Sequence, residues 1–305
     1  MNDPTNQIEE ESRIRSAAYN LTETSGVGML VFDCDGTILP YVEKVHALCV
    51  AKVIKEASER AGIGYTKIIF NELWQQELGK GIQHFFEKYA ENLGGKENKL
   101  FMAEIGTVAN AERLYEDTYI DFAQQSENSR FFRMRNGLLD VFAAAAKAKV
   151  PMAVLSNANE RVLRQSLRTG LDLAGQGDVD LKDIFAAVVG KDMVKKDGNQ
   201  AKPHPSSILS VKSRVEEVTG APVSLPNSIF FGDTLADYNA AKNAGTGRVI
   251  ACDNTLEESE GMSGPDQDGF VVVGQHHNLC EALALYQTYP TQRHHDPYLK
   301  PPTNQ

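Results

Sequence analysis

Two aspartates, Asp33 and Asp35, stand one residue apart at the end of the apolar run "GMLVFD" (28–33), and the turn pair Gly36-Thr37 follows them. In extended backbone, side chains two positions apart point to the same side. Carboxylates held so close repel each other, which raises the pKa of at least one unless a cation neutralises them. Such a pair suits nucleophilic and acid–base chemistry. Taken alone, the stretch also fits a strand followed by an ordinary Asp-Gly turn.

Other polar side chains stand at the ends of later apolar runs. The run "PMAVLSN" (151–157) contains Ser156, and the run "SIFFGD" ends in Asp233, with Asp237 one helical turn further on. Lys202 directly precedes a proline-initiated helical pattern. Singly, these residues also fit a helix cap, a turn and a solvated lysine. Together they predict one site, because open parallel sheets bind ligands at the carboxyl ends of their strands.

The residue types at this expected site favour phosphoryl transfer. Carboxylates from Asp33, Asp35 and Asp233 form the acid-rich, all-oxygen set that Mg²⁺ prefers. Lys202 and the Ser156 hydroxyl supply donors for an anion, and a phosphate monoester carries about −1.5 to −2 charges near neutrality. One aspartate can accept the phosphoryl group, and the second can protonate the leaving alcohol and later activate water.

The elements that must position these residues follow from six short apolar runs. Continuous apolar runs are typical of strands buried on both faces of a parallel sheet. Helical patterns lie between several of them, and the pattern at 205–220 ends at a glycine. The sequence therefore predicts a doubly wound α/β fold with a Rossmann-like parallel sheet. The six runs are 28–33, 151–157, 186–190, 228–233, 247–253 and 269–274. In the helix at 205–220, the residues expected on one side are Ile208, Leu209, Val215 and Val218.

The long interval after the first run has no strand pattern, and its apolar residues recur at helical spacing. A plain crossover needs only about a dozen residues, so we expect an inserted helical module over 41–134. The core then comprises 27–40 and 135–285, after an N-terminal extension over 1–26. The proline-rich tail, 286–305, is expected to be poorly ordered. In the last predicted helix of the module, the apolar residues are Val108, Ala111, Tyr115 and Phe122.

Composition narrows the choice of partners and compartment. The 305 residues carry a formal net charge of −10, which disfavours binding to nucleic acid or an anionic membrane. No apolar run approaches the ~20 residues of a membrane span, and we do not expect the polar N-terminus to act as a signal peptide. Four scattered cysteines suggest a reducing compartment. We therefore expect a cytoplasmic protein without nucleic-acid or membrane partners.

In combination, these motifs resemble those of haloacid dehalogenase-like hydrolases that carry a helical cap after the first strand, the branch of phosphoglycolate phosphatase and beta-phosphoglucomutase. The family signature is D-x-D-G-T, a strand ending in Ser or Thr, Lys-Pro before a helix, and G-D-S/T-x-x-D. The match spans about residues 28 to 275. The corresponding residues here are Asp33-Cys-Asp35-Gly36-Thr37, Ser156, Lys202-Pro203 and Gly232-Asp233-Thr234-Leu-Ala-Asp237.

The resemblance implies roles for the four aspartates. Asp33 would be the nucleophile that forms an aspartyl-phosphate and would lie at the metal. Asp35 would be the general acid/base and would offer its backbone carbonyl to Mg²⁺. Asp233 would ligate the metal, and Asp237 would ligate it or orient its waters.

The resemblance also implies a phosphate-binding set. Ser156 and Lys202 would hold the phosphoryl oxygens, and Lys202 would also stabilise the nucleophile. Gly36, Thr37 and Asn157 would support them.

The second aspartate of the signature favours transfer from oxygen esters over dehalogenation or phosphonate cleavage. The expected function is a Mg²⁺-dependent phosphatase for a small phosphorylated metabolite, acting as a monomer or homodimer. A phosphomutase acting on a sugar phosphate and a non-catalytic phosphate-binding relative are the alternatives. In the cap, the segment "LGKGIQ" with Lys80 resembles a specificity loop, and a plain turn between helices is the other interpretation.

Overall fold

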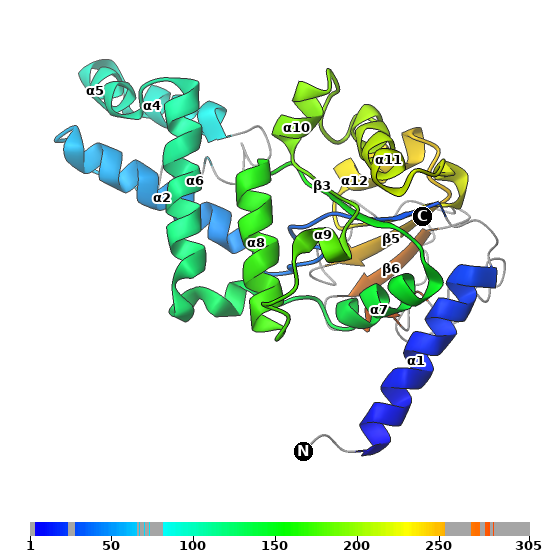
Figure 1. Ribbon diagram of the computed structural model, residues 1–305. Coiled ribbons are helices and arrows are strands. Elements are labelled where there is room, and N and C mark those ends of the chain that lie inside the picture. The colour runs from blue at the N-terminus through cyan, green and yellow to red at the C-terminus, as the bar shows by residue number, and fades with distance from the viewer. Residues whose placement is uncertain are drawn as a thin grey trace, which may run out of the picture. The chain divides into compact units, whose positions relative to one another are not determined.

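The computed structural model describes residues 4–23, 28–65, 67, 70, 73, 82–253, 270–274, 278–280 and 283 (Figure 1). The chain divides into two compact units. One consists of Met1–Pro40 and Phe132–Gln305 and is called the α/β unit below. The other, the helical unit, is Tyr41–Phe131. The role of the helical unit as a cap stays a prediction.

The α/β unit is built on one six-stranded sheet in which every pair of neighbouring strands is parallel. The strand order is β3-β2-β1-β4-β5-β6, the order of a doubly wound sheet, so the expected fold class is confirmed. Each strand falls within one of the six apolar runs. The strands are β1 (Leu30–Phe32), β2 (Met152–Leu155), β3 (Ala187–Val189), β4 (Ile229–Gly232), β5 (Arg248–Asp253) and β6 (Phe270–Gly274).

Helices connect these strands, and α1 packs against α7. Helices of this unit whose bounds are described include α1 (Pro4–Glu23), α7 (Leu138–Ala148), α8 (Glu160–Leu173), α9 (Leu181–Ile184), α10 (Lys191–Lys196), α11 (Ser206–Thr219), the 3₁₀ helix η2 (Leu225–Asn227) and α12 (Leu235–Asn243).

Every residue of β1 to β4 is buried, so both faces of this part of the sheet are covered, as continuously apolar strands indicate. Phe230 belongs to one buried cluster, with side chains of α11 and α12. The next residue, Phe231, points the other way and stacks on Phe32, with ring centroids 4.5 Å apart. Phe32 in turn meets Phe142 of α7 edge-on at 5.7 Å. Figure 1 shows α11 and α12 on one side of the sheet and α7 on the other.

Helix α11 differs from the expected apolar face. Ile208 and Val215 are fully buried, but Leu209 is 45% exposed and Val218 66% exposed. The core face is instead set by Ile208, Val211 and Val215, whose spacing of three and four residues follows the helical repeat. The expected stop is found, because Gly220 ends the helix in the left-handed conformation (φ 68°).

In the described part of the helical unit, all regular secondary structure is helical. Its elements are α2 (Glu43–Arg60), α4 (Ile82–Leu93), α5 (Gly95–Ile105), α6 (Val108–Gln124) and the 3₁₀ helix η1 (Ser126–Phe132), which runs into the α/β unit.

Aromatic side chains form much of the interior of the helical unit. Tyr89 and Phe101 are fully buried with ring centroids 5.2 Å apart. In α6, Ala111 and Tyr115 are buried as expected, but Val108 is 47% exposed. Val108 is the first residue of the helix, directly after the capping residue Thr107, so it lies at the exposed end of the helix.

Candidate active site

Strands β1 and β4 pair at the centre of the sheet, where the strand order reverses. Asp33 directly follows β1, and its backbone N–H donates to the carbonyl oxygen of Phe231, 2.8 Å away. Asp233 directly follows β4. In doubly wound sheets this switch point is the place where ligands bind. The two aspartates that the sequence singled out therefore leave the sheet side by side, at the position where chemistry is expected.

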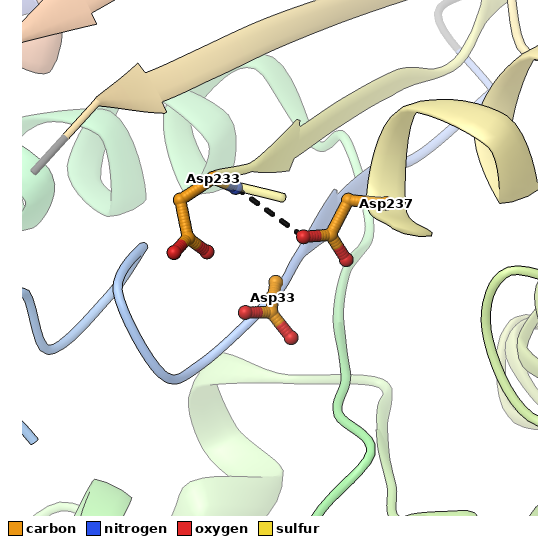
Figure 2. A group of neighbouring side chains, drawn as sticks. All are labelled: Asp33, Asp233 and Asp237. Carbon is orange, nitrogen blue, oxygen red and sulfur yellow. Dashed lines mark hydrogen bonds between the residues drawn. The ribbon is translucent and has the colours of Figure 1, made fainter. Parts of the chain in front are cut away.

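Three carboxylates gather at this edge. Asp33, Asp233 and Asp237 each offer one oxygen, and these oxygens lie within 4.8 Å of one another. Figure 2 shows the three side chains grouped beside the end of the strand that precedes Asp233. Asp33 and Asp237 are buried, and Asp233 is half-buried. Among the described residues, these three make up the group, and the carboxylate of Asp35 is not part of it.

Lys202 joins two of these carboxylates. Its ammonium donates to Oδ1 of Asp33 and to Oδ1 of Asp237, the latter at 2.5 Å. The side chains of all three residues are buried, that of Lys202 to 3% exposure. A lysine ammonium carries three protons, so these two bonds leave one for a third acceptor.

Burial and charge shape the protonation of this pair. Burial raises the pKa of the Asp33 carboxyl well above its ordinary value, and the nearby charges of Asp237 and Asp35 add to the rise, which Lys202 opposes. Burial alone would lower the pKa of Lys202, but the negative charges of Asp237 and Asp33 reverse this and hold it above its ordinary value. Lys202 therefore stays charged, and Asp33 needs further positive charge nearby to ionise fully at neutral pH.

Asp237 has a structural task beside its contact with Lys202. It is the third residue of α12 and forms a capping box with Thr234, the residue before the helix. Its Oδ2 accepts the Thr234 N–H at 3.0 Å and the Thr234 hydroxyl at 2.6 Å. The same oxygen accepts the N–H of Asp233 at 3.3 Å, which is the dashed line in Figure 2. Both oxygens of Asp237 are thus in use.

The turn after Asp35 reaches the carboxylate of Asp233. The Thr37 hydroxyl, which is fully buried, donates to Asp233 Oδ1 at 3.0 Å. Gly36 has φ +84°, and a Cβ atom there would lie 1.9 Å from Asp233 Oδ2. Glycine is therefore required here both by the backbone conformation and by the close approach of the carboxylate. Asp35 itself is half-buried.

Ser156 and Asn157 bond to backbone atoms. The Ser156 hydroxyl oxygen accepts the N–H of Ala158 at 3.0 Å, which leaves its proton available to donate. The Asn157 amide donates to the carbonyl oxygen of Lys202 at 3.1 Å. Asn157 thus fixes the backbone of the lysine, a contact that the sequence did not predict. Lys80, the candidate of the helical module, lies outside the described residues.

One buried residue at this edge was missed from the sequence. Arg135 is 2% exposed, and its guanidinium donates to the carbonyl oxygens of Gly36 and Thr37. No spacing rule connects a lone arginine with a turn almost a hundred positions earlier. The only signal in the sequence is a charged residue set just before the apolar run that becomes α7.

The arrangement fits a divalent cation and a phosphoryl group. Three carboxylates face one ammonium, so acidic groups outnumber the cation whether or not Asp33 is ionised, and a divalent cation would offset the excess negative charge. The donor set consists of oxygens, as Mg²⁺ prefers. The remaining proton of Lys202 and the hydroxyl of Ser156 offer donors for an anion.

The sheet is all-parallel and doubly wound, so the protein is of the α/β class. Its candidate site, the group of carboxylates with Lys202, lies just after β1 and β4. The sequence matches the family model described as haloacid dehalogenase-like hydrolase over residues 27–245, so the chain belongs to this family and the resemblance is confirmed. A comparison with curated proteins found no match.

Solved structures of similar fold include sugar-phosphate enzymes. CbbY from Rhodobacter sphaeroides, in a mutant bound to xylulose-(1,5)bisphosphate, aligns with a TM-score of 0.53 at 20% identity, covering 80% of this chain and 93% of that one. A putative beta-phosphoglucomutase from Thermotoga maritima aligns with a TM-score of 0.55 at 18% identity, covering 85% and 98%. Beta-phosphoglucomutase from Clostridium difficile gives 0.54 at 15% identity, covering 86% and 96%. At these identities the likeness concerns the fold.

In the part of the chain that the structure describes, no helix combines the length and the apolar character needed to cross a membrane.

Proposed function

We propose that the protein is a Mg²⁺-dependent phosphatase that hydrolyses a small phosphorylated metabolite through an aspartyl-phosphate on Asp33. The observation that carries this proposal is the position of Asp33 at the switch point, bonded to the Lys202 ammonium and within 4.8 Å of two further carboxylates. Membership of the haloacid dehalogenase-like hydrolases supports it.

The metal would be held among the carboxylates of the group. Asp237 already binds Lys202 with one oxygen and caps α12 with the other. Direct ligation therefore falls to Asp33 and Asp233, with the backbone carbonyl of Asp35, while Asp237 holds its neighbours in place. When bound, Mg²⁺ supplies positive charge that offsets the carboxylates and the phosphoryl oxygens. Its presence would also keep Asp33 ionised.

The first half-reaction belongs to Asp33 and Asp35. A carboxylate oxygen of Asp33 attacks phosphorus, and the bond from phosphorus to the leaving oxygen breaks. Asp35, two positions further along the chain, gives its proton to that oxygen so that an alcohol leaves. Lys202 and Ser156 hold the phosphoryl oxygens in line, Lys202 with the proton that its two aspartates do not use.

The second half-reaction reverses the proton transfer. Asp35, now ionised, takes a proton from water as the water oxygen attacks phosphorus. The bond from Asp33 to phosphorus breaks, and inorganic phosphate leaves with Asp33 regenerated. The helical unit is proposed to act as a cap that excludes bulk water and selects the substrate, which favours small metabolites over macromolecular substrates.

The test is release of inorganic phosphate from a panel of phosphorylated metabolites, weighted toward sugar phosphates because the similar CbbY structure holds one. We expect release that needs Mg²⁺, stops with a chelator and is lost in Asp33→Asn by at least about a thousandfold. Asp178→Asn, an equal change at an exposed position, is the matched control and is expected to keep full activity. Release that persists in Asp33→Asn would contradict the proposal.

A phosphomutase is the second candidate, favoured by the beta-phosphoglucomutases of similar fold. The two reactions share Asp33 and differ in whether water or a substrate hydroxyl takes the phosphoryl group. Conversion of one sugar phosphate into its isomer without net phosphate release would identify the mutase. If Asp33→Asn and wild type are equally inactive on every compound yet both bind phosphate, the non-catalytic alternative holds.

A further inference from the structure

Arg135 is a buried cation to which the reaction proposed above gives no task. It stands three residues after the chain re-enters the α/β unit at Phe132 and two before Gly137, which precedes α7. Only 2% of the residue is exposed. Burying a guanidinium is costly unless acceptors lie nearby, so the acceptors that Arg135 contacts indicate its role.

Arg135 donates to three successive carbonyl groups. Its Nη2 donates to the carbonyl oxygen of Gly36 at 2.5 Å, and its Nε donates to that of Thr37 at 2.9 Å. Its own backbone N–H donates to the carbonyl oxygen of Ile38, also at 2.9 Å. Residues 36–38 are thus held from outside by one residue that is distant in sequence.

Two backbone hydrogen bonds close the turn that Arg135 holds. The Gly36 N–H donates to the Leu39 carbonyl oxygen at 3.1 Å, and the Leu39 N–H donates to that of Cys34 at 3.0 Å. These two bonds lie within the turn, whereas the contacts of Arg135 and the bond from Thr37 to Asp233 connect it to other segments. The chain leaves the α/β unit after Pro40 and returns at Phe132, so the contacts of Arg135 join the outgoing and the returning segments at their bases.

Two site contacts depend on where this turn lies. The Thr37 hydroxyl donates to Asp233 Oδ1 at 3.0 Å, and Asp35 stands next to Gly36 at the start of the turn. A shift of the turn by about 1 Å would lengthen the Thr37–Asp233 bond and move the carboxyl of Asp35, and displacements of that size can cost about a hundredfold in rate.

We propose that Arg135 is a positioning residue: by binding the carbonyl oxygens of Gly36 and Thr37 together, it fixes the turn that places Asp35 for proton transfer and Thr37 on Asp233. This inference rests on the proposed phosphatase function. The planar guanidinium is suited to the task because its donors diverge in a rigid fork, whereas a lysine ammonium on a flexible stem holds one carbonyl at a time.

The test compares wild type with Arg135→Met, which removes the donors, and Arg135→Lys, which keeps the charge. Val215→Ala is the control, because Val215 is fully buried in α11 and its truncation destabilises the same unit away from the turn. For each protein we would measure kcat and KM for p-nitrophenyl phosphate, the Mg²⁺ dissociation constant by calorimetry, and Tm.

We expect Arg135→Met to lower kcat by about 30- to 100-fold with little change in KM, since the turn positions reacting groups rather than binding the ester. Its Mg²⁺ affinity should fall by about tenfold, as is common when a partner of a metal ligand is displaced. Arg135→Lys should recover part of both. Val215→Ala should lower Tm while kcat and Mg²⁺ affinity stay within about twofold of wild type.

A folded Arg135→Met protein with wild-type kcat and Mg²⁺ affinity would overturn the inference. So would a Val215→Ala protein that loses as much of both at an equal Tm, because the effect would then be general destabilisation. If Arg135→Met does not fold, Arg135→Lys decides, and a kcat within about twofold of wild type counts against the proposal. Wild type that releases no phosphate contradicts the proposed function, and the calorimetric comparison then decides on Arg135 alone.

Discussion

Asp237 links Lys202 to the start of helix α12. One oxygen of its carboxylate lies 2.5 Å from the lysine Nζ, and the other accepts the N–H and hydroxyl of Thr234 at 3.0 and 2.6 Å. Both side chains of the charged pair are almost completely buried, at 3% and 1% exposure. A single carboxylate therefore sets the position of the lysine that contacts Asp33 and the position of the backbone that follows β4.

Replacing Asp237 by Asn should be costly because the amide has one acceptor oxygen where the carboxylate uses two. Either Lys202 or the capping box loses its partner, and a buried ammonium loses one of its two negative charges. We expect Asp237→Asn to lower the free energy of unfolding by about 2–4 kcal/mol in urea denaturation. Thr234→Ala removes only the capping hydroxyl and should cost about 1 kcal/mol. Equal losses in the two variants would show that the lysine contact contributes nothing.

The Thr37 hydroxyl is expected to matter more for metal binding than for stability. Thr37→Val keeps the shape of the fully buried side chain but removes the bond to Asp233 Oδ1. The free energy of unfolding should fall by about 1–2 kcal/mol, and the Mg²⁺ concentration for half-maximal activity should rise by about tenfold, because Asp233 loses its orienting partner. Thr37→Ser keeps the hydroxyl and serves as the control. A normal Mg²⁺ requirement in Thr37→Val would refute the orienting role.

Much of this site was predictable because parallel strands end at one edge of the sheet. Asp33 and Asp233 each directly follow an apolar run, so recognising the two runs as neighbouring parallel strands is enough to bring the carboxylates together. The order of the strands along the sheet is not written in any single run. It follows from the helical crossovers and their packing on both faces, which the alternation of runs and helical patterns indicates.

Other features depend on contacts that no local pattern encodes. Arg135 donates to the backbone carbonyl oxygens of Gly36 and Thr37. Every residue has such a carbonyl group, so the sequence does not indicate which residues the arginine contacts. Asn157 follows a strand end like a ligand but donates to the backbone of Lys202. In α11, the predicted apolar face was wrong in part, because Leu209 and Val218 are exposed. Periodicity alone does not determine which apolar residues of a helix stay exposed to water.

We expect Gly36 to tolerate no side chain, because of its backbone conformation and because of the carboxylate beside it. Its φ of +84° strains any other residue, and a Cβ atom would lie 1.9 Å from Asp233 Oδ2. Gly220→Ala is a matched control, because Gly220 has φ +68° with open space around the added atom. Gly220→Ala should cost about 1–2 kcal/mol, the penalty of the left-handed conformation alone. Gly36→Ala should cost more and should lower phosphatase activity by at least about tenfold, since Asp233 must move. Equal costs in urea denaturation, with activity retained, would contradict the close approach.

The pH dependence of stability can be tested at Asp197, away from the site. Burial alone would raise the pKa of this carboxyl, but the Ser210 hydroxyl and the Arg214 guanidinium, whose Nη2 lies 2.7 Å from Oδ1, hold it below the ordinary value of 3.8. A carboxyl whose pKa is lower in the folded state stabilises the protein above its unfolded pKa. That stabilisation is lost as the pH falls through the pKa of the folded state.

Asp197→Asn should therefore reduce the free energy of unfolding at pH 7 by up to about 1 kcal/mol, a small effect because the pair is partly exposed. The difference from wild type should begin to shrink once the pH drops below 3.8 and should disappear in stronger acid. Urea denaturation at several pH values measures this, with Asp178→Asn as the exposed control. A difference that grows toward acid would mean that the pKa of Asp197 is raised, opposite to its contacts.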